Sequence, residues 1–146
     1  MDQQSSPDPG AAARALAPVI DAASETIEAT RRIPEPLLTR LHESRLLRML
    51  LPRSVGGDQV EPGAFFEAVE KVSQHDASLG WILFVANSAD LIAPFLDRAV
   101  AQRIFGAPNS AVAWGPPNGC RSVAVPGGYR LNGRWDFASG CRIATW

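Results

Sequence analysis

The chain has 146 residues, of which 46% are hydrophobic, and its 14 basic and 15 acidic residues leave a formal net charge of -1. This length and composition predict one compact domain, although two incomplete domains would also fit. The near-neutral charge argues against nucleic acid or a membrane surface as a partner, and the longest apolar run, residues 79–86, is far shorter than the roughly 20 residues of a membrane span.

The first ten residues, MDQQSSPDPG, contain no apolar core and no arginines, so we expect neither a secretory signal nor a transit peptide there. Residues 1–10 are predicted to form a disordered tail. Cys120 and Cys141 lack the CxxC spacing, which indicates reduced thiols in a cytoplasmic protein. With only His42 and His75 beside them, the sequence predicts no metal site.

Residues 11–106 are predicted to form a helical domain of five helices. The first helix carries one apolar stripe, at spacings of three and four residues, formed by Leu16, Ile20, Ala23 and Ile27. Pro18 lies inside that pattern. It either starts the main helix or kinks it, because proline lacks an N–H and crowds the preceding turn.

A second helix is predicted to start near Pro34, with Leu38 and Leu41 on its apolar face and His42 turned to water. Residues 51–63 then break the helical period. Because this stretch contains a Gly-Gly pair, which allows positive φ, and a proline near each end, it predicts a defined loop.

The third and fourth helices follow this loop. The third is predicted to begin at Pro62, which suits a first helical turn, and Asp76 is placed to cap the fourth. Residues 78–96 are apolar nearly all round, which predicts a buried central helix with Trp81 in the core. A fifth helix is expected over residues 97–105, with Gly106 closing it in the left-handed conformation.

After Gly106 the hydrophobic period changes from 3.6 to 2, which is typical of strands. Residues 110–114 and 121–125 have strand patterns, and residues 126–128 (PGG) predict a turn. Apolar residues then alternate around a second turn signal, Asn132-Gly133. At most four short strands with open edges are therefore present, and residues 107–146 are predicted to form an incomplete β domain.

Three stretches carry a family resemblance in this order: RRIPEPLLTRLHESRLLRMLLPRSVGG, HDASLGW and GRWDFASGC. Together they resemble the acyl-CoA dehydrogenase superfamily and, within it, the flavin-dependent aromatic hydroxylases that work with a separate flavin reductase. The resemblance covers about residues 31–146. It implies an α+β, mostly α fold, namely the amino-terminal helical domain and the start of the central β domain, with the carboxy-terminal four-helix bundle missing.

The resemblance also implies a flavin site. Phe137, Ala138 and Ser139 fall where the superfamily lays backbone and side chains against the flavin, and Ser139 matches the catalytic hydroxyl residue near the flavin N5. Trp114 lies in the other flavin-side loop, where ordinary acyl-CoA dehydrogenases carry an acidic Ser-Asp motif, so the departure favours the hydroxylase branch. Spacing alone leaves other interpretations open: Trp114 and Phe137 as core residues and Ser139-Gly140 as a turn.

The fourth helix is expected to line the substrate pocket through Trp81, Asn87 and Ser88. The polar residues there either face the substrate or face solvent at the end of the helix. Several hydroxylases of this type place a histidine on this helix, and the aligned position here is near Ala89. The general base is therefore not identified by the sequence.

The function implied by the resemblance is that of a flavin-dependent monooxygenase fragment, in which reduced FMN or FAD and oxygen hydroxylate an aromatic or related small substrate. The alternatives are an acyl-CoA dehydrogenase and a non-catalytic helical module that binds a partner. The implied partners are the small substrate and a flavin reductase, and the family usually forms homotetramers. This chain alone is expected to be inactive.

Overall fold

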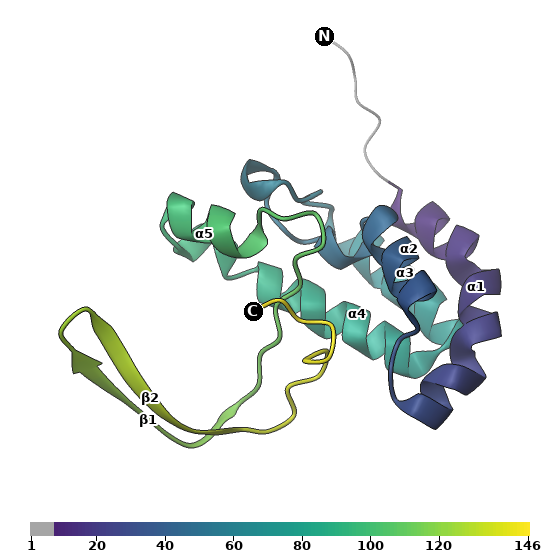
Figure 1. The fold of residues 1–146 in the computed structure, drawn as a ribbon. Coiled ribbons are helices and arrows are strands. Elements are labelled where there is room, and N and C mark those ends of the chain that lie inside the picture. Colours follow the sequence, from purple (N-terminus) through teal and green to yellow (C-terminus); the bar gives the residue numbers. More distant parts are fainter. Residues whose placement is uncertain (1–7) are drawn as a thin grey trace, which may run out of the picture.

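The computed structural model describes residues 8–146. Across these residues it contains five α-helices followed by one antiparallel pair of strands, so the fold is mostly helical, as predicted (Figure 1). Of the predicted tail, residues 1–7 lie outside the described residues. Helix α1 already begins at Pro9, so residues 9 and 10 are helical and not part of a tail.

Helix α1 (Pro9–Thr30) is one continuous helix that contains Pro18. Its start is capped because an oxygen of the Asp8 carboxylate accepts a hydrogen bond of 2.8 Å from the Ala11 N–H. The predicted apolar stripe is confirmed, since Leu16, Ile20 and Ile27 are buried. The stripe packs against α3, and together they begin the main core.

Helix α2 (Glu35–Glu43) buries Leu37 and Leu41, whereas Leu38 is only half-buried. The prediction that His42 faces water is wrong. His42 is half-buried, and its Nδ1 atom lies in the interior without a hydrogen-bond partner. The reason is that the chain folds back directly after α2 into a short 3-10 turn, η1 (Leu46–Arg48), which packs against the helix.

The loop predicted over residues 51–63 contains a second 3-10 turn, η2 (Arg53–Val55), and Gly56 adopts a positive φ of 85° there. A buried guanidinium holds this loop in place. The nitrogens of Arg48 donate hydrogen bonds to the carbonyl oxygens of Val55 (3.2 Å), Phe105 (2.8 Å) and Ala107 (2.6 Å). Arg48 therefore joins the loop to the end of the helical region, which no local sequence pattern predicts.

Helices α3 (Pro62–His75) and α4 (Ala77–Asp90) are separated by Asp76 alone. Asp76 caps α4 as predicted, because its carboxylate accepts a hydrogen bond of 2.8 Å from the Leu79 N–H. Helix α4 packs against α3 and η1 and contributes Leu79 and Leu83 to the core. It is thus the central helix of the fold.

One side of α4 nevertheless faces outward. Trp81 is 56% exposed, so its predicted place in the core is wrong. It stacks on Phe84 with ring centroids 5.6 Å apart. The helix is apolar on more sides than the core covers, because α3 and η1 cover only part of its circumference.

The stretch Ala77–Phe95, which comprises α4 and the 3-10 turn η3 (Ala93–Phe95), meets the length and composition of a membrane-crossing helix. Half of this stretch is buried inside the fold. The α-helix itself covers only its first 14 residues. Its apolar character is that of a core helix, and length and composition are weak evidence for anything more.

Helix α5 (Arg98–Phe105) is capped by Asp97 and buries Ala101 and Phe105 in a smaller apolar cluster with Leu51 and its neighbours. The predicted left-handed conformation of Gly106 is wrong, because its φ is −69°. Glycine is needed there for space: a Cβ atom would lie 2.3 Å from the carbonyl oxygen of Gln102.

The strands β1 (Pro117–Val125) and β2 (Gly128–Trp135) form an antiparallel hairpin around the predicted turn at residues 126–128. The second predicted turn, Asn132-Gly133, is wrong because both residues lie inside β2. Gly133 stands opposite an irregularity of β1 with a φ of 152°, and a Cβ atom at this position would collide with Cys120. Figure 1 shows the hairpin projecting from the helical body.

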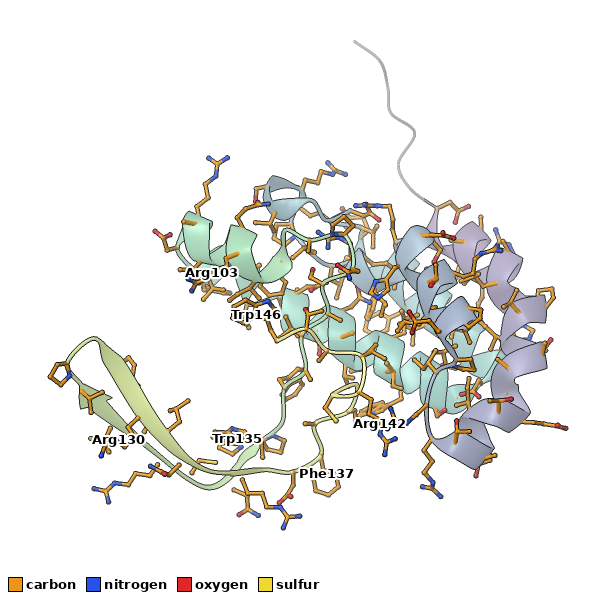
Figure 2. All side chains as sticks on the ribbon, viewed as in Figure 1. Arg103, Arg130, Trp135, Phe137, Arg142 and Trp146 are labelled. Carbon is orange, nitrogen blue, oxygen red and sulfur yellow. The ribbon has the colours of Figure 1, made fainter. Side chains whose placement is uncertain are left out.

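Residues 110–114, predicted as a strand, lie outside this sheet. They run beside the last residues of the chain: the N–H of Thr145 donates to the carbonyl oxygen of Ala111 (2.8 Å), and that of Ala113 donates to Trp146 (3.1 Å). The chain therefore returns from the hairpin to the helical body, where the guanidinium of Arg103 on α5 lies 6.0 Å from the centroid of the Trp146 ring (Figure 2). Up to four strands were expected, and the described residues contain two.

Candidate functional site

The outward side of α4 gathers residues from three segments. Trp81 and Ser88 are seven positions apart, so they lie on one side of the helix. Trp81 reaches the segment that follows the hairpin, and Ser88 reaches the segment that precedes it. Four of the seven predicted site residues, Trp81, Ser88, Trp114 and Ser139, therefore meet on this surface.

The first contact joins α4 to Ser139. The indole Nε1–H of Trp81 donates a hydrogen bond of 3.0 Å to the hydroxyl oxygen of Ser139. The Ser139 N–H in turn donates to the carbonyl oxygen of Phe137 (2.8 Å), which shapes a tight turn. Within residues 8–146 the Ser139 hydroxyl hydrogen has no acceptor, so this hydroxyl is oriented by Trp81 and still able to donate.

The second contact joins α4 to Trp114. The Trp114 Nε1–H donates to the hydroxyl oxygen of Ser88 (3.1 Å) and to the carbonyl oxygen of Val85 (3.3 Å). Trp114 is more than half exposed, so its interpretation as a core residue is wrong. Its indole is held at one end, and much of its ring surface stays accessible.

Phe137 differs from a core residue even more clearly. Its side chain is 89% exposed, and its backbone has a positive φ of 57°, which is rare for a bulky residue. Because β2 ends at Trp135, the strand alternation does not carry through to Phe137. Figure 2 shows Phe137 directed away from the helical body. The next residue, Ala138, is half-buried.

Asn87 does not line this surface, so its predicted place in a substrate pocket is wrong. Its side chain is fully buried and makes four hydrogen bonds. The amide oxygen accepts from the N–H groups of Met49 and Leu50, and the amide nitrogen donates to the carbonyl oxygens of Leu46 and Leu83. Asn87 therefore pairs the backbone of η1 and the residues after it with α4, as a structural residue.

Asp90 is a second buried polar residue of α4. One of its carboxylate oxygens is buried without a hydrogen-bond partner. Burial raises the pKa of Asp90 to about 8, and the positive charge of Arg48 only partly offsets this. The signal in the sequence was an aspartate at the end of an otherwise apolar helix, which the solvent-facing interpretation passed over.

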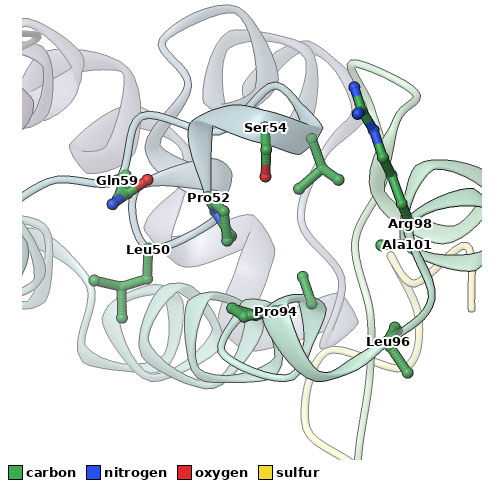
Figure 3. A pocket seen from close by; sticks show the side chains of 10 residues that line it. Leu50, Pro52, Ser54, Gln59, Pro94, Leu96, Arg98 and Ala101 are labelled. Carbon is green, nitrogen blue, oxygen red and sulfur yellow. The ribbon is translucent and has the colours of Figure 1, made fainter.

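One cavity adjoins the candidate site and another lies apart from it. The first, of about 310 Å³, is lined by Trp81, Ser139 and residues on either side of them, so it adjoins the candidate site. The second, of about 620 Å³, lies between the loop around Pro52 and the segment from Pro94 to Ala101, and Figure 3 shows Leu50 and Arg98 at its walls. None of the predicted site residues lines the second cavity.

The residues of this surface fit the requirements of a flavin ring. It presents one oriented hydroxyl with a free hydrogen, at Ser139, and an aromatic side chain with an accessible face, Trp114, whereas Phe137 is exposed and directed away from the helical body. A planar ring with polar edges needs both kinds of group. In the part of the chain that the structure describes, no three His, Cys, Asp or Glu side chains cluster as metal ligands would.

The sequence matches no family model. It is 31% identical, over 137 residues, to the flavin-dependent monooxygenase oxygenase subunit HsaA of Rhodococcus jostii, a match covering 90% of this chain and 35% of the relative. It is 30% identical, over 132 residues, to the oxygenase component of the FADH(2)-dependent resorcinol hydroxylase of a Rhizobium strain, covering 90% of this chain and 32% of the relative.

The fold leads to the same group of proteins. The crystal structure of the HsaA monooxygenase from Mycobacterium tuberculosis superimposes with a TM-score of 0.85 and 29% identity, covering 95% of this chain and 38% of the other. The chain thus spans about a third of the length of the proteins it matches. These matches are monooxygenases and hydroxylases, which separates the hydroxylase interpretation from the acyl-CoA dehydrogenase alternative.

Proposed function

Since this chain is a homologue of the oxygenase subunits of flavin-dependent monooxygenases and shares their acyl-CoA dehydrogenase-like fold, we propose that it forms one wall of the site at which such an oxygenase hydroxylates an aromatic or related small substrate. The observation that carries this proposal is the hydrogen bond from Trp81 to Ser139, which leaves the Ser139 hydroxyl hydrogen free. The cofactor is reduced flavin, FMN or FAD.

Reduced flavin, when bound, would be the group that reacts with oxygen. The residues of this chain supply position and dryness. Ser139 would donate its hydroxyl hydrogen to the polar edge of the ring, because Trp81 fixes the orientation of that hydroxyl. The accessible indole face of Trp114, which is tied to Ser88 on the same side of α4, would exclude water once a ring covers it.

The relatives are described as an oxygenase subunit and an oxygenase component, which implies a two-component system. We therefore propose that a separate flavin reductase delivers the reduced flavin. A homotetramer and a cytoplasmic location, both expected from the sequence, belong to the same proposal. The general base stays unassigned, because Ala89 occupies the aligned position and is buried.

The test is a chimera in which residues 8–146 replace the aligned segment of the Rhizobium resorcinol hydroxylase. We expect the chimera to hydroxylate resorcinol with FADH2 and oxygen, measured as product formed per hydrogen peroxide released. Ser139→Ala should lower this ratio by up to about tenfold, because one hydrogen bond is typically worth 0.5 to 1.5 kcal/mol.

The matched control is Ser122→Ala, which removes an exposed hydroxyl from β1 and should leave the ratio unchanged. A chimera that folds and binds FADH2 but forms no hydroxylated product would contradict the proposed function. If product forms and Ser139→Ala does not change the ratio, the role given to Ser139 is wrong.

A further inference from the structure

The cavity beside the Trp81–Ser139 pair has a second wall that the proposed function does not use. This wall comes from the corner after α1, residues 31–33, and from the segment that follows Ser139. It carries three arginines, Arg31, Arg32 and Arg142. Figure 2 shows Arg142 between the C-terminal segment and the helical body.

These three guanidinium groups have no acidic partner within residues 8–146, since none of them takes part in an ion pair there. Other arginines of the chain do find one: Arg45 pairs with Asp58, and Arg134 pairs with Asp136. The sequence separation of Arg142 from the other two shows that the tertiary fold, and not a local basic run, brings the three charges to one cavity.

The acidic groups nearby do not cancel this charge. Glu28 lines an adjoining cavity that shares Arg31 and Arg32, which leaves the arginines in excess. The carboxylate of Asp76 is occupied: it accepts hydrogen bonds from Ser24, Ser78 and the N–H of Leu79. Ser78, at the amino end of α4, also lines the cavity, and the helix dipole adds to the positive potential there.

The remaining lining is apolar or aromatic. Ile33, Ile82 and Ile143 contribute alkyl surface, and Trp81 contributes its indole. A volume of about 310 Å³ is at the lower end of the range for small-ligand sites. An apolar chamber with unpaired guanidinium groups suits a ligand that has a flat apolar part and an oxyanion, because guanidinium forks match carboxylate and phosphate geometry.

We propose that this cavity, defined by Arg31, Arg32, Arg142 and the Trp81–Ser139 pair, binds the oxyanion of a small aromatic molecule. The inference rests on the proposed function, because Ser139 lines this cavity and also belongs to the proposed flavin site. The oxyanion has two sources: the phosphate of the flavin or a carboxylate of the substrate. Their shared chemistry is what the three arginines recognise.

The experiment measures binding to this chain by isothermal titration calorimetry with two pairs of probes. FMN is compared with riboflavin, which lacks the phosphate, and benzoate is compared with benzamide, which lacks the charge. The charged member of at least one pair should bind about fivefold or more tightly than the neutral member, the upper range for exposed ion pairs. The pair that shows the difference identifies the source.

The variants Arg31→Gln and Arg142→Gln should bring the affinity for the charged probe down to that for its neutral partner, while the neutral probe binds as before. Arg142→Lys should keep part of the difference. Arg40→Gln is the matched control, because Arg40 is exposed on α2, pairs with Glu43 and lies outside the cavity.

Equal affinities within both pairs would overturn the proposal, as would a charge-dependent difference that survives both glutamine variants. Circular dichroism checks that the exposed substitutions leave the helices intact. Failure here is distinguishable from failure of the proposed function, because hydroxylation by the chimera and its dependence on Ser139 are measured without reference to the arginines.

Discussion

The helical body and the hairpin of this chain differ in how far they bury their apolar side chains. The body, from α1 to α5, buries a main core and a smaller apolar cluster, with side chains such as Ile20, Leu41 and Val72 almost completely removed from water. In the hairpin, no residue of β1 or β2 is buried. Apolar side chains of the hairpin, among them Tyr129 and Leu131, are mostly exposed.

This difference explains where the candidate site lies. The body is held by its own core, so it offers a fixed surface on α4. The two strands of the hairpin are joined to each other by strand pairing. The segments on either side of the hairpin, at Trp114 and Ser139, attach it to the surface of α4. The candidate site therefore lies where the helical body, which has its own core, meets the hairpin, whose apolar side chains are exposed.

The largest expected difference in stability is between two leucine substitutions, one in the helical body and one in the hairpin. Leu41→Ala removes a side chain that is 1% exposed and should cost about 3 kcal/mol of unfolding free energy, because it leaves a cavity in the core. Leu131→Ala removes one that is 61% exposed and should cost less than about 0.5 kcal/mol. Urea unfolding followed by circular dichroism measures both, and similar costs would break the comparison.

Asparagines give the next contrast. Asn87→Ala should cost about 2 kcal/mol, since it leaves the N–H of Met49 and other buried backbone groups without partners. Asn118→Ala in β1 loses one exposed hydrogen bond to Asp136 and should change stability by less than about 0.5 kcal/mol. The same urea titration applies, and a cost for Asn87→Ala no larger than for Asn118→Ala would contradict the buried network.

Asp90 should make stability depend on pH. Its pKa is raised from an ordinary value of 3.8 to about 8, so the folded chain keeps a proton that the unfolded chain releases. Stability should therefore fall as pH rises from about 4 to about 8 and then level off. Asp90→Asn removes the charge and should stabilise the protein by on the order of 2 kcal/mol at high pH, with little effect near pH 4.

The control for this change lies beside the hairpin. Asp136→Asn breaks an ion pair with the exposed Arg134 and should alter stability by less than about 1 kcal/mol. Chemical unfolding of both variants at a series of pH values provides the measurement. If Asp90→Asn follows the pH profile of the unmodified chain, its carboxylate does not carry the charge cost.

The smallest expected effect concerns the contact between Trp81 and Ser139, which joins α4 to the segment after the hairpin. Trp81→Phe keeps an aromatic ring to stack on Phe84 but removes the N–H that reaches Ser139, so it should cost less than about 1 kcal/mol. Hydrogen exchange at residues 137–143 should nevertheless become faster, because their tie to α4 is gone. Unchanged exchange in that segment would mean that other contacts hold it.

Much of the helical body was predictable because its information is local. The stripe of Leu16, Ile20 and Ile27 follows from the helical period, and the cap at Asp76 follows from the chemistry of an orphan helix N–H group. The turn at residues 126–128 followed in the same way. The proposal that Ser139 belongs to the functional site came from the resemblance of its motif, because periodicity alone would have assigned this residue to a turn.

Tertiary structure decided what local patterns could not. A helix that is apolar nearly all round does not state which side the rest of the chain will cover, so Trp81 was expected inside and lies outside. Asn87 and Arg48 are buried because carbonyl and N–H groups far along the chain needed partners. The three arginines of the cavity meet for the same reason: proximity between distant segments is set by packing, and the sequence carries it only through the whole fold.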